Sequence, residues 1–273
     1  MTLGIDIGGT TINLGLVEGT RVIRKVQVPS FPPTAMLEET LLYLGDRIAD
    51  IQVPGITRMG IGVPSIVDPA QGIVYDAANI PSWTVVPLKE VLERRFGIPV
   101  SVNNDANCYA LGAALKLGGA AATVVTVTLG TGIGTGIVID GKLFSGTHCG
   151  AGEICSIPYN GADYESFCSK KFFTMNGTVP KDAALAAERG EEKGLALFRS
   201  FGEHLGRFLS VVLFSYDADC IVLGGGIAHS FPLFRTSMWD SLRSSYPYQR
   251  SLDSLDIIPM PEEDTALIGA SSL

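Results

Sequence analysis

Short runs of aliphatic and β-branched residues alternate with glycine-rich or Glu-Gly turns over the first thirty residues. These runs predict a meander of three strands at Leu3–Ile7, Ile12–Glu18 and Arg21–Val28. The period then changes over Thr34–Ile51, where apolar residues recur at three- and four-residue spacing behind two prolines. That spacing predicts an amphipathic helix.

The alternation of strand and helix patterns continues to residue 117. The sequence predicts strands at Arg58–Val63 and Pro99–Asn103, and helices at Val86–Phe96 and Ala106–Leu117. Between the strand at Arg58–Val63 and the helix at Val86–Phe96 lies an extended stretch that contains several prolines. The order βββαβαβα combines a strand meander with crossover helices, and it favours an α/β sheet with helical layers.

The pattern then begins again, with strands at Ala122–Leu129 and Gly132–Ile139 followed by an Asp-Gly hairpin signal. A shift of 121 residues aligns five identical residues within positions 9–17. We therefore expect two related lobes. Later segments predict a long helix, a buried strand and a terminal helix, at Leu195–Tyr216, Cys220–Leu223 and Asp264–Leu273.

Composition narrows the class of protein. The chain has 273 residues, of which 46% are hydrophobic and 18% charged, so it can bury a substantial core in one large domain or two small lobes. The formal charge of −8 repels polyanions, and we expect no nucleic-acid partner. No apolar run approaches the roughly 18 residues that span a bilayer. We expect a soluble, cytoplasmic protein with no membrane partner.

The five cysteines are odd in number and show no CxxC spacing, so reduced thiols are the default expectation rather than a disulfide framework.

The first candidate for chemistry is Asp6-Ile7-Gly8-Gly9-Thr10-Thr11, where a strand ends in an acid, two glycines and two hydroxyls. Glycines let backbone N–H groups approach a phosphate, hydroxyls donate to its oxygens, and the acid can hold Mg²⁺ directly or through water. An ordinary tight hairpin is the alternative. The equivalent turn at 129–134 favours phosphate, because two such loops can hold one polyphosphate. Neither loop is a Walker or a Rossmann motif.

A third glycine cluster, at 224–226, lies between a buried strand and a helix, where a bare backbone lets a nucleotide approach closely. Asp105 lies where a strand leads into a helix, and it is either the N-cap of that helix or the base that takes a proton from an acceptor hydroxyl. Asn104 would then hydrogen-bond a polyol. Glu153 and Glu165 could bind sugar hydroxyls, and surface solvation is the alternative for both.

In their order along the chain, these motifs resemble the ROK family of sugar kinases and related repressors, within the actin and hexokinase superfamily. Asp6–Thr10 resembles its first phosphate motif, Asn104-Asp105-Ala106 its catalytic motif, and Leu129–Gly134 its second phosphate loop. Gly152-Glu153-Ile154 resembles its signature, and Ile221–Gly226 its adenosine-side motif.

The resemblance implies a two-lobed actin/hexokinase-like (ribonuclease H-like) fold that closes on a hexose. It implies ATP and Mg²⁺ as cofactors, transfer of the γ-phosphoryl group to a hydroxyl of glucose or a close relative, at the primary hydroxyl, and a homodimer. We expect the lobes to be residues 1–105, joined by the helix 264–273, and residues 106–263.

By the same resemblance, Asp105 is the catalytic base and Asp6 helps to place the Mg²⁺. The implied sugar-binding residues are Asn104, Glu153, Glu165, Ser65 and Asn79. The implied nucleotide- and phosphate-binding residues are Asp6, Gly8, Gly9, Thr10, Gly130, Thr131, Gly132, Gly225 and Gly226.

The chain departs from the family pattern at its zinc site. Many members follow this signature with a histidine and a cysteine cluster that bind structural zinc, whereas here Ser156 stands at the histidine position and the next segment is too short for the cluster. The spacing of His148, Cys149, Cys155 and Cys168 fits no common zinc pattern, and we expect no zinc. Loss of that histidine also removes an expected sugar contact.

Two alternatives to an ATP-dependent kinase remain. One is a sugar-binding regulatory protein of the same family without catalysis, against which the retained Asp105 and both phosphate loops argue. A family repressor would carry a DNA-binding domain ahead of the first motif, and we expect none here. The other is a glucokinase that uses polyphosphate, which would need a basic track that Lys170-Lys171 alone does not supply.

Overall fold

The computed structural model describes residues 1–51, 55–77, 79–147, 149–262 and 264–273. The chain divides into two compact units. The first unit comprises Met1–Ala120, Gly136–Ala151 and Glu263–Leu273. The second unit comprises Ala121–Thr135 and Gly152–Glu262.

The first unit is built on a five-stranded sheet with the order β3-β2-β1-β4-β8. Its strands are β1 (Thr2–Ile7), β2 (Thr11–Glu18), β3 (Arg21–Pro29), β4 (Arg58–Val63) and β8 (Val100–Asn104). The first three strands form the expected antiparallel meander, while β4 and β8 run parallel to β1. The predicted positions of all five strands are confirmed to within two residues.

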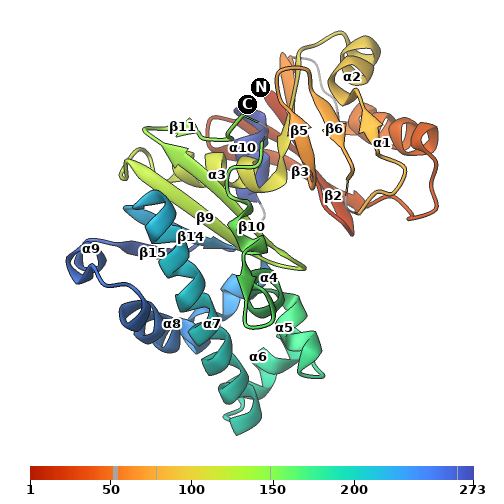
Figure 1. Ribbon diagram of the computed structural model, residues 1–273. Helices are drawn as coiled ribbons and strands as arrows, with labels where there is room; N and C mark the ends of the chain where they lie inside the picture. The colour runs from red at the N-terminus through yellow and green to blue at the C-terminus, as the bar shows by residue number, and fades with distance from the viewer. Residues whose placement is uncertain (52–54, 78, 148, 263) are drawn as a thin grey trace. The chain divides into compact units, whose positions relative to one another are not determined.

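Helices cover both faces of this sheet (Figure 1). They are α1 (Leu37–Ile51), α2 (Leu88–Phe96), α3 (Asp105–Lys116) and α10 (Asp264–Ser271). Leu44 and Ile48 of α1 are fully buried, in agreement with the predicted amphipathic face. Helix α10 packs against α3 and β1. Its backbone approaches the sheet so closely that a Cβ added at Gly60 would lie 1.7 Å from the carbonyl oxygen of Ala270.

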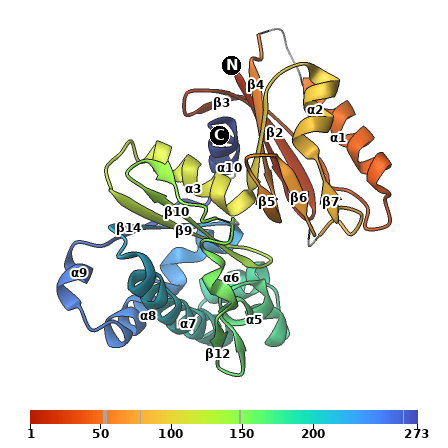
Figure 2. The same ribbon diagram turned by 45° about the horizontal axis from the view of Figure 1, so that its top comes forward.

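Beside the main sheet, a small antiparallel sheet occupies the stretch that the sequence indicated only as extended (Figure 2). It consists of β5 (Ile66–Asp68), β6 (Ile73–Tyr75) and β7 (Val85–Val86). The indole of the fully buried Trp83 donates a hydrogen bond to Thr40 at 2.7 Å, which ties this region to α1.

The second five-stranded sheet has the order β11-β10-β9-β14-β15. Its strands are β9 (Thr123–Leu129), β10 (Ile133–Ile139), β11 (Lys142–Leu143), β14 (Cys220–Gly224) and β15 (Asp256–Pro259). In both sheets the third, second and first strands of the meander are followed by two parallel strands. The 121-residue shift moves β1 onto residues 123–128, within β9. The structure therefore confirms the duplication that the sequence predicted.

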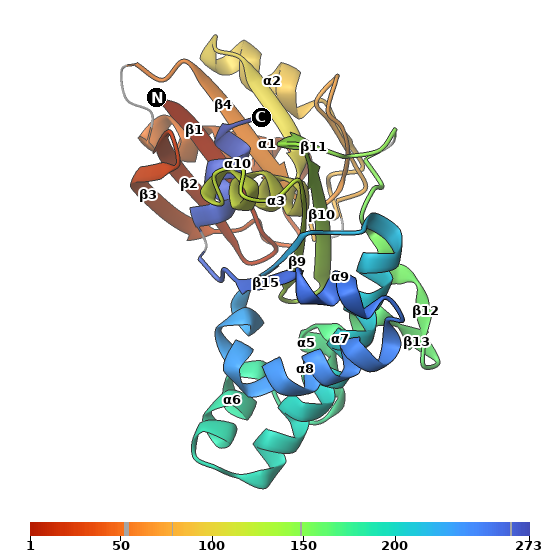
Figure 3. The same cartoon turned by 90° about the vertical axis from the view of Figure 1, so that its left-hand side faces the viewer.

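Most helices of the second unit pack around α7 (Glu192–Tyr216). Helix α8 (Phe231–Ser245) runs beside it (Figure 3), and the contact is close because a Cβ at Gly206 of α7 would lie 2.3 Å from the carbonyl oxygen of Met238. The remaining helices are η1 (Glu153–Ser156), α4 (Tyr164–Cys168), α5 (Lys170–Met175), α6 (Pro180–Glu188), η2 (Gly226–Ser230) and α9 (Gln249–Asp253). Two short strands, β12 (Pro158–Tyr159) and β13 (Ala162–Asp163), form a hairpin between η1 and α4.

The division by contacts differs from the expected boundary after Asp105. Helix α3 belongs to the first unit because it packs against α10, and residues 136–151 return to that unit as well. The second half of β10 lies against α3, where a Cβ at Gly136 would be 2.5 Å from the carbonyl oxygen of Ala106. Within the described residues, no helix is both long and apolar enough to cross a membrane.

Candidate active site

The carboxyl ends of β1, β4 and β8 meet at one edge of the first sheet. Strand register pairs Asp6 with Gly62 and Gly62 with Asn103. Asp105 follows β8 directly, and a Cβ added at Gly62 would lie 3.3 Å from its Cα. In sheets with parallel strands, ligands bind outside this edge. The structure thus brings Asp6 and Asp105 to the same edge of the sheet.

The N-cap of α3 is Asn104 and not Asp105. The Asn104 Oδ1 accepts hydrogen bonds from the N–H groups of Ala106 at 2.9 Å and Asn107 at 3.2 Å. Its Nδ2 donates to the carbonyl oxygen of Ser65 at 3.2 Å. Asp105 occupies the first turn, where its Oδ1 accepts the N–H of Ala106 at 2.8 Å. The capping role considered for Asp105 therefore falls on its neighbour.

Two hydrogen bonds at Gly8 fix the turn after β1. The Gly8 N–H donates to the carbonyl oxygen of Thr11 at 2.8 Å, and the Ser30 hydroxyl donates to the Gly8 carbonyl at 2.8 Å. Gly9 and Thr10 are exposed. Asn79 lies beside this turn, because a Cβ at Gly9 would be 3.1 Å from its Nδ2. A Gly-Gly-Thr turn fixed this way can present N–H groups to an anion.

Sequence reasoning missed the side chains that orient Asp6. Asn13 is buried and lies opposite Asp6 in the hairpin register, and its Nδ2 donates to Asp6 Oδ2 at 3.4 Å. Gln27 in turn donates to Asn13 Oδ1 at 2.9 Å. The signal was present in the sequence, because the short turn between β1 and β2 sets that pairing.

In the second unit, two of the glycine clusters lie together. Gly225 has a φ of +78°, and a Cβ there would lie 2.5 Å from the carbonyl oxygen of Leu129, the last residue of β9. At Gly226 an added Cβ would meet nothing within 4 Å, and at Gly130 only one atom at 3.9 Å. Packing within the unit therefore explains Gly225, while an added Cβ at the other two would lie in open space.

The two glutamates lie close to each other in the second unit. Partial burial raises the pKa of Glu153, and the charge of Glu165 raises it further. Glu165 forms an ion pair with Lys171, a residue that sequence reasoning did not connect to it, and the hydrogen bond from Lys171 to Glu165 raises the pKa of the lysine. Gly132 of the second loop adjoins this carboxylate, because a Cβ there would lie 2.5 Å from Oε2.

The predicted residues thus form two groups. In the first unit the structure places near one another Asp6, Gly8, Gly9, Thr10, Ser65, Asn79, Asn104 and Asp105. In the second unit it places near one another Gly130, Thr131, Gly132, Glu153, Glu165, Gly225 and Gly226. The Ser65 hydroxyl donates to the carbonyl oxygen of Tyr75, and Ser65 contacts Asn104 through its backbone carbonyl.

The region of the family zinc cluster holds the β12–β13 hairpin instead. The Tyr159 ring stacks on Tyr164 at a centroid distance of 4.2 Å, and its hydroxyl lies 2.9 Å from Nδ1 of His204 on α7. All five cysteines are free and buried. Among the described residues, no three His, Cys, Asp or Glu side chains are grouped to hold a metal. His148, one of the four considered for zinc, lies outside the described residues.

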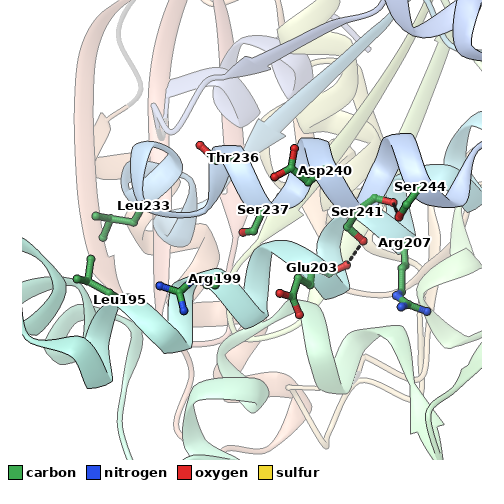
Figure 4. Close-up of a pocket in the computed structure, with 10 residues that line it drawn as sticks. All are labelled: Leu195, Arg199, Glu203, Arg207, Leu233, Thr236, Ser237, Asp240, Ser241 and Ser244. Carbon is green, nitrogen blue, oxygen red and sulfur yellow. Dashed lines mark hydrogen bonds between the residues drawn. The ribbon is translucent and has the colours of Figure 1, made fainter.

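A groove of about 550 Å³ runs between α7 and α8 (Figure 4). It is lined by charged and hydroxyl side chains, including Arg199, Glu203, Arg207 and Asp240. The Ser241 hydroxyl, on its wall, donates to the carbonyl oxygen of Glu203 at 2.6 Å. Basic and acidic side chains balance in this lining, and none of the predicted site residues contributes to it.

Comparisons with known proteins agree with this arrangement. The model of the ROK family matches residues 2–273. A glucokinase from Streptomyces coelicolor is 30% identical over 287 residues, covering 90% of this chain and 87% of that protein. A glucokinase from Thermotoga maritima is 26% identical over 313 residues, covering 99% of this chain and 96% of that protein.

A solved structure is similar as well. The ROK family glucokinase from Streptomyces griseus, in complex with glucose and AMPPNP, superposes with a TM-score of 0.85 at 25% identity, covering 99% of this chain and 98% of that one. The family match over the whole chain and the shared architecture of duplicated sheets lead to one conclusion. The chain belongs to the ROK family and has its actin/hexokinase-like fold.

Proposed function

We propose that the protein is an ATP-dependent sugar kinase that transfers the γ-phosphoryl group to a hydroxyl of a hexose, glucose or a close relative, at the primary hydroxyl. One observation carries the proposal. Asp105 lies directly after β8 at the edge of the sheet where Asp6 lies near the end of β1, while Asn104 caps α3. The glucokinases among the relatives support the same activity.

In this proposal Asp105 is the general base. Its carboxylate accepts the proton of the acceptor hydroxyl as the new phosphorus–oxygen bond forms. The hydrogen bond from the Ala106 N–H to Oδ1 fixes the orientation of the carboxylate. General-base catalysis typically contributes about 10²–10⁴-fold to a rate.

The residues of the first unit fit a magnesium ion. Mg²⁺ prefers oxygen ligands, usually one or two carboxylates together with water and phosphate oxygens. Asp6 offers a carboxylate that Asn13 orients, beside the exposed Gly9-Thr10 turn. When bound, Mg²⁺ neutralises charge on the phosphates. Asp6 would hold the ion directly or through water, and Gly8, Gly9 and Thr10 would donate to phosphate oxygens.

The glycines of the second unit fit a nucleotide. No neighbouring protein atom requires glycine at Gly130 or Gly226, since an added Cβ would lie in open space. Glycine keeps that space free, so that a nucleotide can approach the backbone there. We assign the turn Gly130-Thr131-Gly132 to phosphate and Gly225-Gly226 to the adenosine side.

The sugar would be bound by carboxylate and amide groups. Ionised Glu153 and Glu165 accept hydrogen bonds from hydroxyls, and Asn104, whose Oδ1 is used in the cap of α3, can donate its second Nδ2 hydrogen. Asn79 and Ser65, which lie near the first phosphate turn and Asn104, complete the proposed set. The histidine expected from the family at position 156 is a serine here, so that sugar contact is missing from the proposed set.

The test is release of ADP from ATP and Mg²⁺ in the presence of glucose, mannose, fructose, allose, glucosamine, N-acetylated hexosamines and a β-glucoside. We expect one strong acceptor, and a loss of about 10²–10⁴-fold in kcat for Asp105→Asn, with sugar binding retained in calorimetry. Asp140→Asn, at the exposed turn between β10 and β11, is the matched control. Full activity of Asp105→Asn would exclude it as the base.

Two outcomes would favour the alternatives. Sugar binding without turnover from any donor would indicate a regulatory protein. Turnover with polyphosphate and not with ATP would indicate a polyphosphate-using glucokinase. The proposal includes a homodimer in the cytoplasm, and light scattering of the purified protein tests the dimer.

A further inference from the structure

Both oxygens of the Glu165 carboxylate are engaged within the second unit. Oε2 accepts the backbone N–H of Ile133 at 3.3 Å, and Oε1 accepts a hydrogen bond from Nζ of Lys171. Ile133 follows the glycine-rich turn after β9, while Lys171 lies in the first turn of α5. The carboxylate therefore connects the second phosphate turn to the α4–α5 segment.

A backbone contact connects the same two segments. The N–H of Lys170 donates to the carbonyl oxygen of Gly130 at 2.9 Å. The fully buried Ser169 accepts the N–H of Lys171 through its hydroxyl at 3.1 Å, which fixes the start of α5. Gly132 leaves room for this contact, because a Cβ there would lie 2.5 Å from Glu165 Oε2 and the carboxylate would have to shift.

We propose that Lys171 is a positioning residue that holds Glu165 against the second phosphate turn, so that one carboxylate serves both the turn and the sugar. This inference rests on the proposed function, which assigns the turn to phosphate and Glu165 to sugar. An ionised carboxylate has about four acceptor sites. The contacts with Ile133 and Lys171 use two of them, so others remain for sugar hydroxyls.

Charge is the second reason why this site needs a lysine. A carboxylate beside the turn repels the phosphates that the turn would bind. The ammonium group of Lys171 offsets that charge while directing the carboxylate toward the N–H of Ile133. Asp163, whose charge also raises the pKa of Lys171, makes the surroundings still more acidic. Lys171 is thus a local source of positive charge for this cluster.

The arrangement has a thermodynamic consequence. A sugar that binds Glu165 restrains the carboxylate and, through it, the turn. Any change that sugar binding makes in the affinity for nucleotide is then matched by an equal change that nucleotide makes in the affinity for sugar, because coupling between two sites is reciprocal.

The alternative is an ordinary surface ion pair. The Lys171 side chain is 52% exposed, and exposed pairs contribute little to stability. The two cases predict different exchange rates for one amide hydrogen. Only the positioning role protects the amide hydrogen of Ile133 from exchange with solvent.

The experiment compares the full-length protein with Lys171→Met, Lys171→Arg and Lys170→Met. The last variant is the matched control, since it removes the same charge from the adjacent exposed residue and keeps the backbone contact with Gly130. Amide exchange of Ile133 is measured by NMR, and the affinity for AMPPNP with Mg²⁺ by calorimetry. For Lys171→Met we expect exchange several-fold faster and binding about two- to fivefold weaker. Lys171→Arg should behave as the parent protein, and so should Lys170→Met.

Equal behaviour of Lys171→Met and Lys170→Met in both measurements would overturn the inference. Weaker AMPPNP binding with unchanged exchange would also overturn it, since Lys171 would then act through charge alone. Faster exchange with unchanged affinity would show that holding Glu165 against the turn does not support nucleotide binding, and would overturn that part of the inference. If AMPPNP does not bind the parent protein, the proposed donor is wrong, and the exchange of Ile133 decides the positioning role by itself.

Discussion

The hydroxyl of Tyr159 lies 2.9 Å from Nδ1 of His204, and this contact fastens the β12–β13 hairpin to α7. Partial burial lowers the pKa of His204. The hairpin occupies the segment where many family members are expected to bind zinc, and it leads directly into Tyr164 and Glu165. Stacking of Tyr159 on Tyr164 and the contact with His204 hold this hairpin in place.

Tyr159→Phe removes only that hydrogen bond and keeps the ring stacked on Tyr164. We expect a loss of about 1 kcal/mol of unfolding free energy, which lowers Tm by about 2 °C in a chain of this size. Circular dichroism during heating measures the change. Tyr248→Phe is the control, because that residue is 63% exposed. Equal Tm shifts in the two variants would show that the contact with His204 does not stabilise the hairpin.

Glu153→Gln should make stability less dependent on pH. Burial and the charge of Glu165 raise the pKa of Glu153 above its ordinary value of 4.5, so the folded protein binds this proton more tightly than the unfolded chain. The charged form therefore costs stability, and the cost develops as pH rises from 4.5 through the folded pKa. We expect Glu153→Gln to raise Tm by about 1 °C at pH 7.5 and to leave it unchanged near pH 4.

The exposed Glu188 at the end of α6 supplies the control, Glu188→Gln. A Glu153→Gln variant with a constant Tm difference across the pH range would contradict the assigned cause. Weaker sugar binding by the same variant is expected, because residues that bind ligand are often held at a cost in stability.

Gly60→Ala should be severely destabilising, although the residue belongs to none of the sequence motifs. Its Cβ would lie 1.7 Å from the carbonyl oxygen of Ala270, and the nearest atoms are all backbone, so no flexible side chain can move aside. We expect a loss of about 3–5 kcal/mol, measured by urea unfolding. Gly150→Ala, where a Cβ would meet nothing within 4 Å, should change little. A mild effect at residue 60 would show that α10 can shift away from the sheet.

The sequence predicted most elements whose pattern is periodic and long. The meander of the first sheet, α1 and the long helix α7 follow directly from the spacing of apolar residues. The small sheet β5–β7 was missed because its strands have only two or three residues among prolines, too few for a period to show. The helices of 164–188 were not assigned either, since each is short and interrupted by caps such as Ser169.

The sequence indicated which residues are candidates for the site, but not which residues contact one another there. The motifs and the family resemblance singled out Asp105 and Glu165 as candidates, but the N-cap of α3 depends on a backbone conformation one residue earlier, at Asn104. The ion pair of Glu165 with Lys171 spans six residues and crosses the break between α4 and α5. A single helix would not bring residues at that spacing together, so no pattern in the sequence could have indicated it.

The buried helix α10 also governs when the first unit can form during synthesis. Gly4 and Gly60 of the sheet both lie directly against its backbone, and their strands precede α10 by about 260 and about 200 residues. A ribosome therefore releases the sheet long before the helix that covers it. Residues 152–262 of the second unit emerge in between. They can fold while the first sheet is still without α10. Chaperone binding during synthesis should therefore concentrate on the first unit.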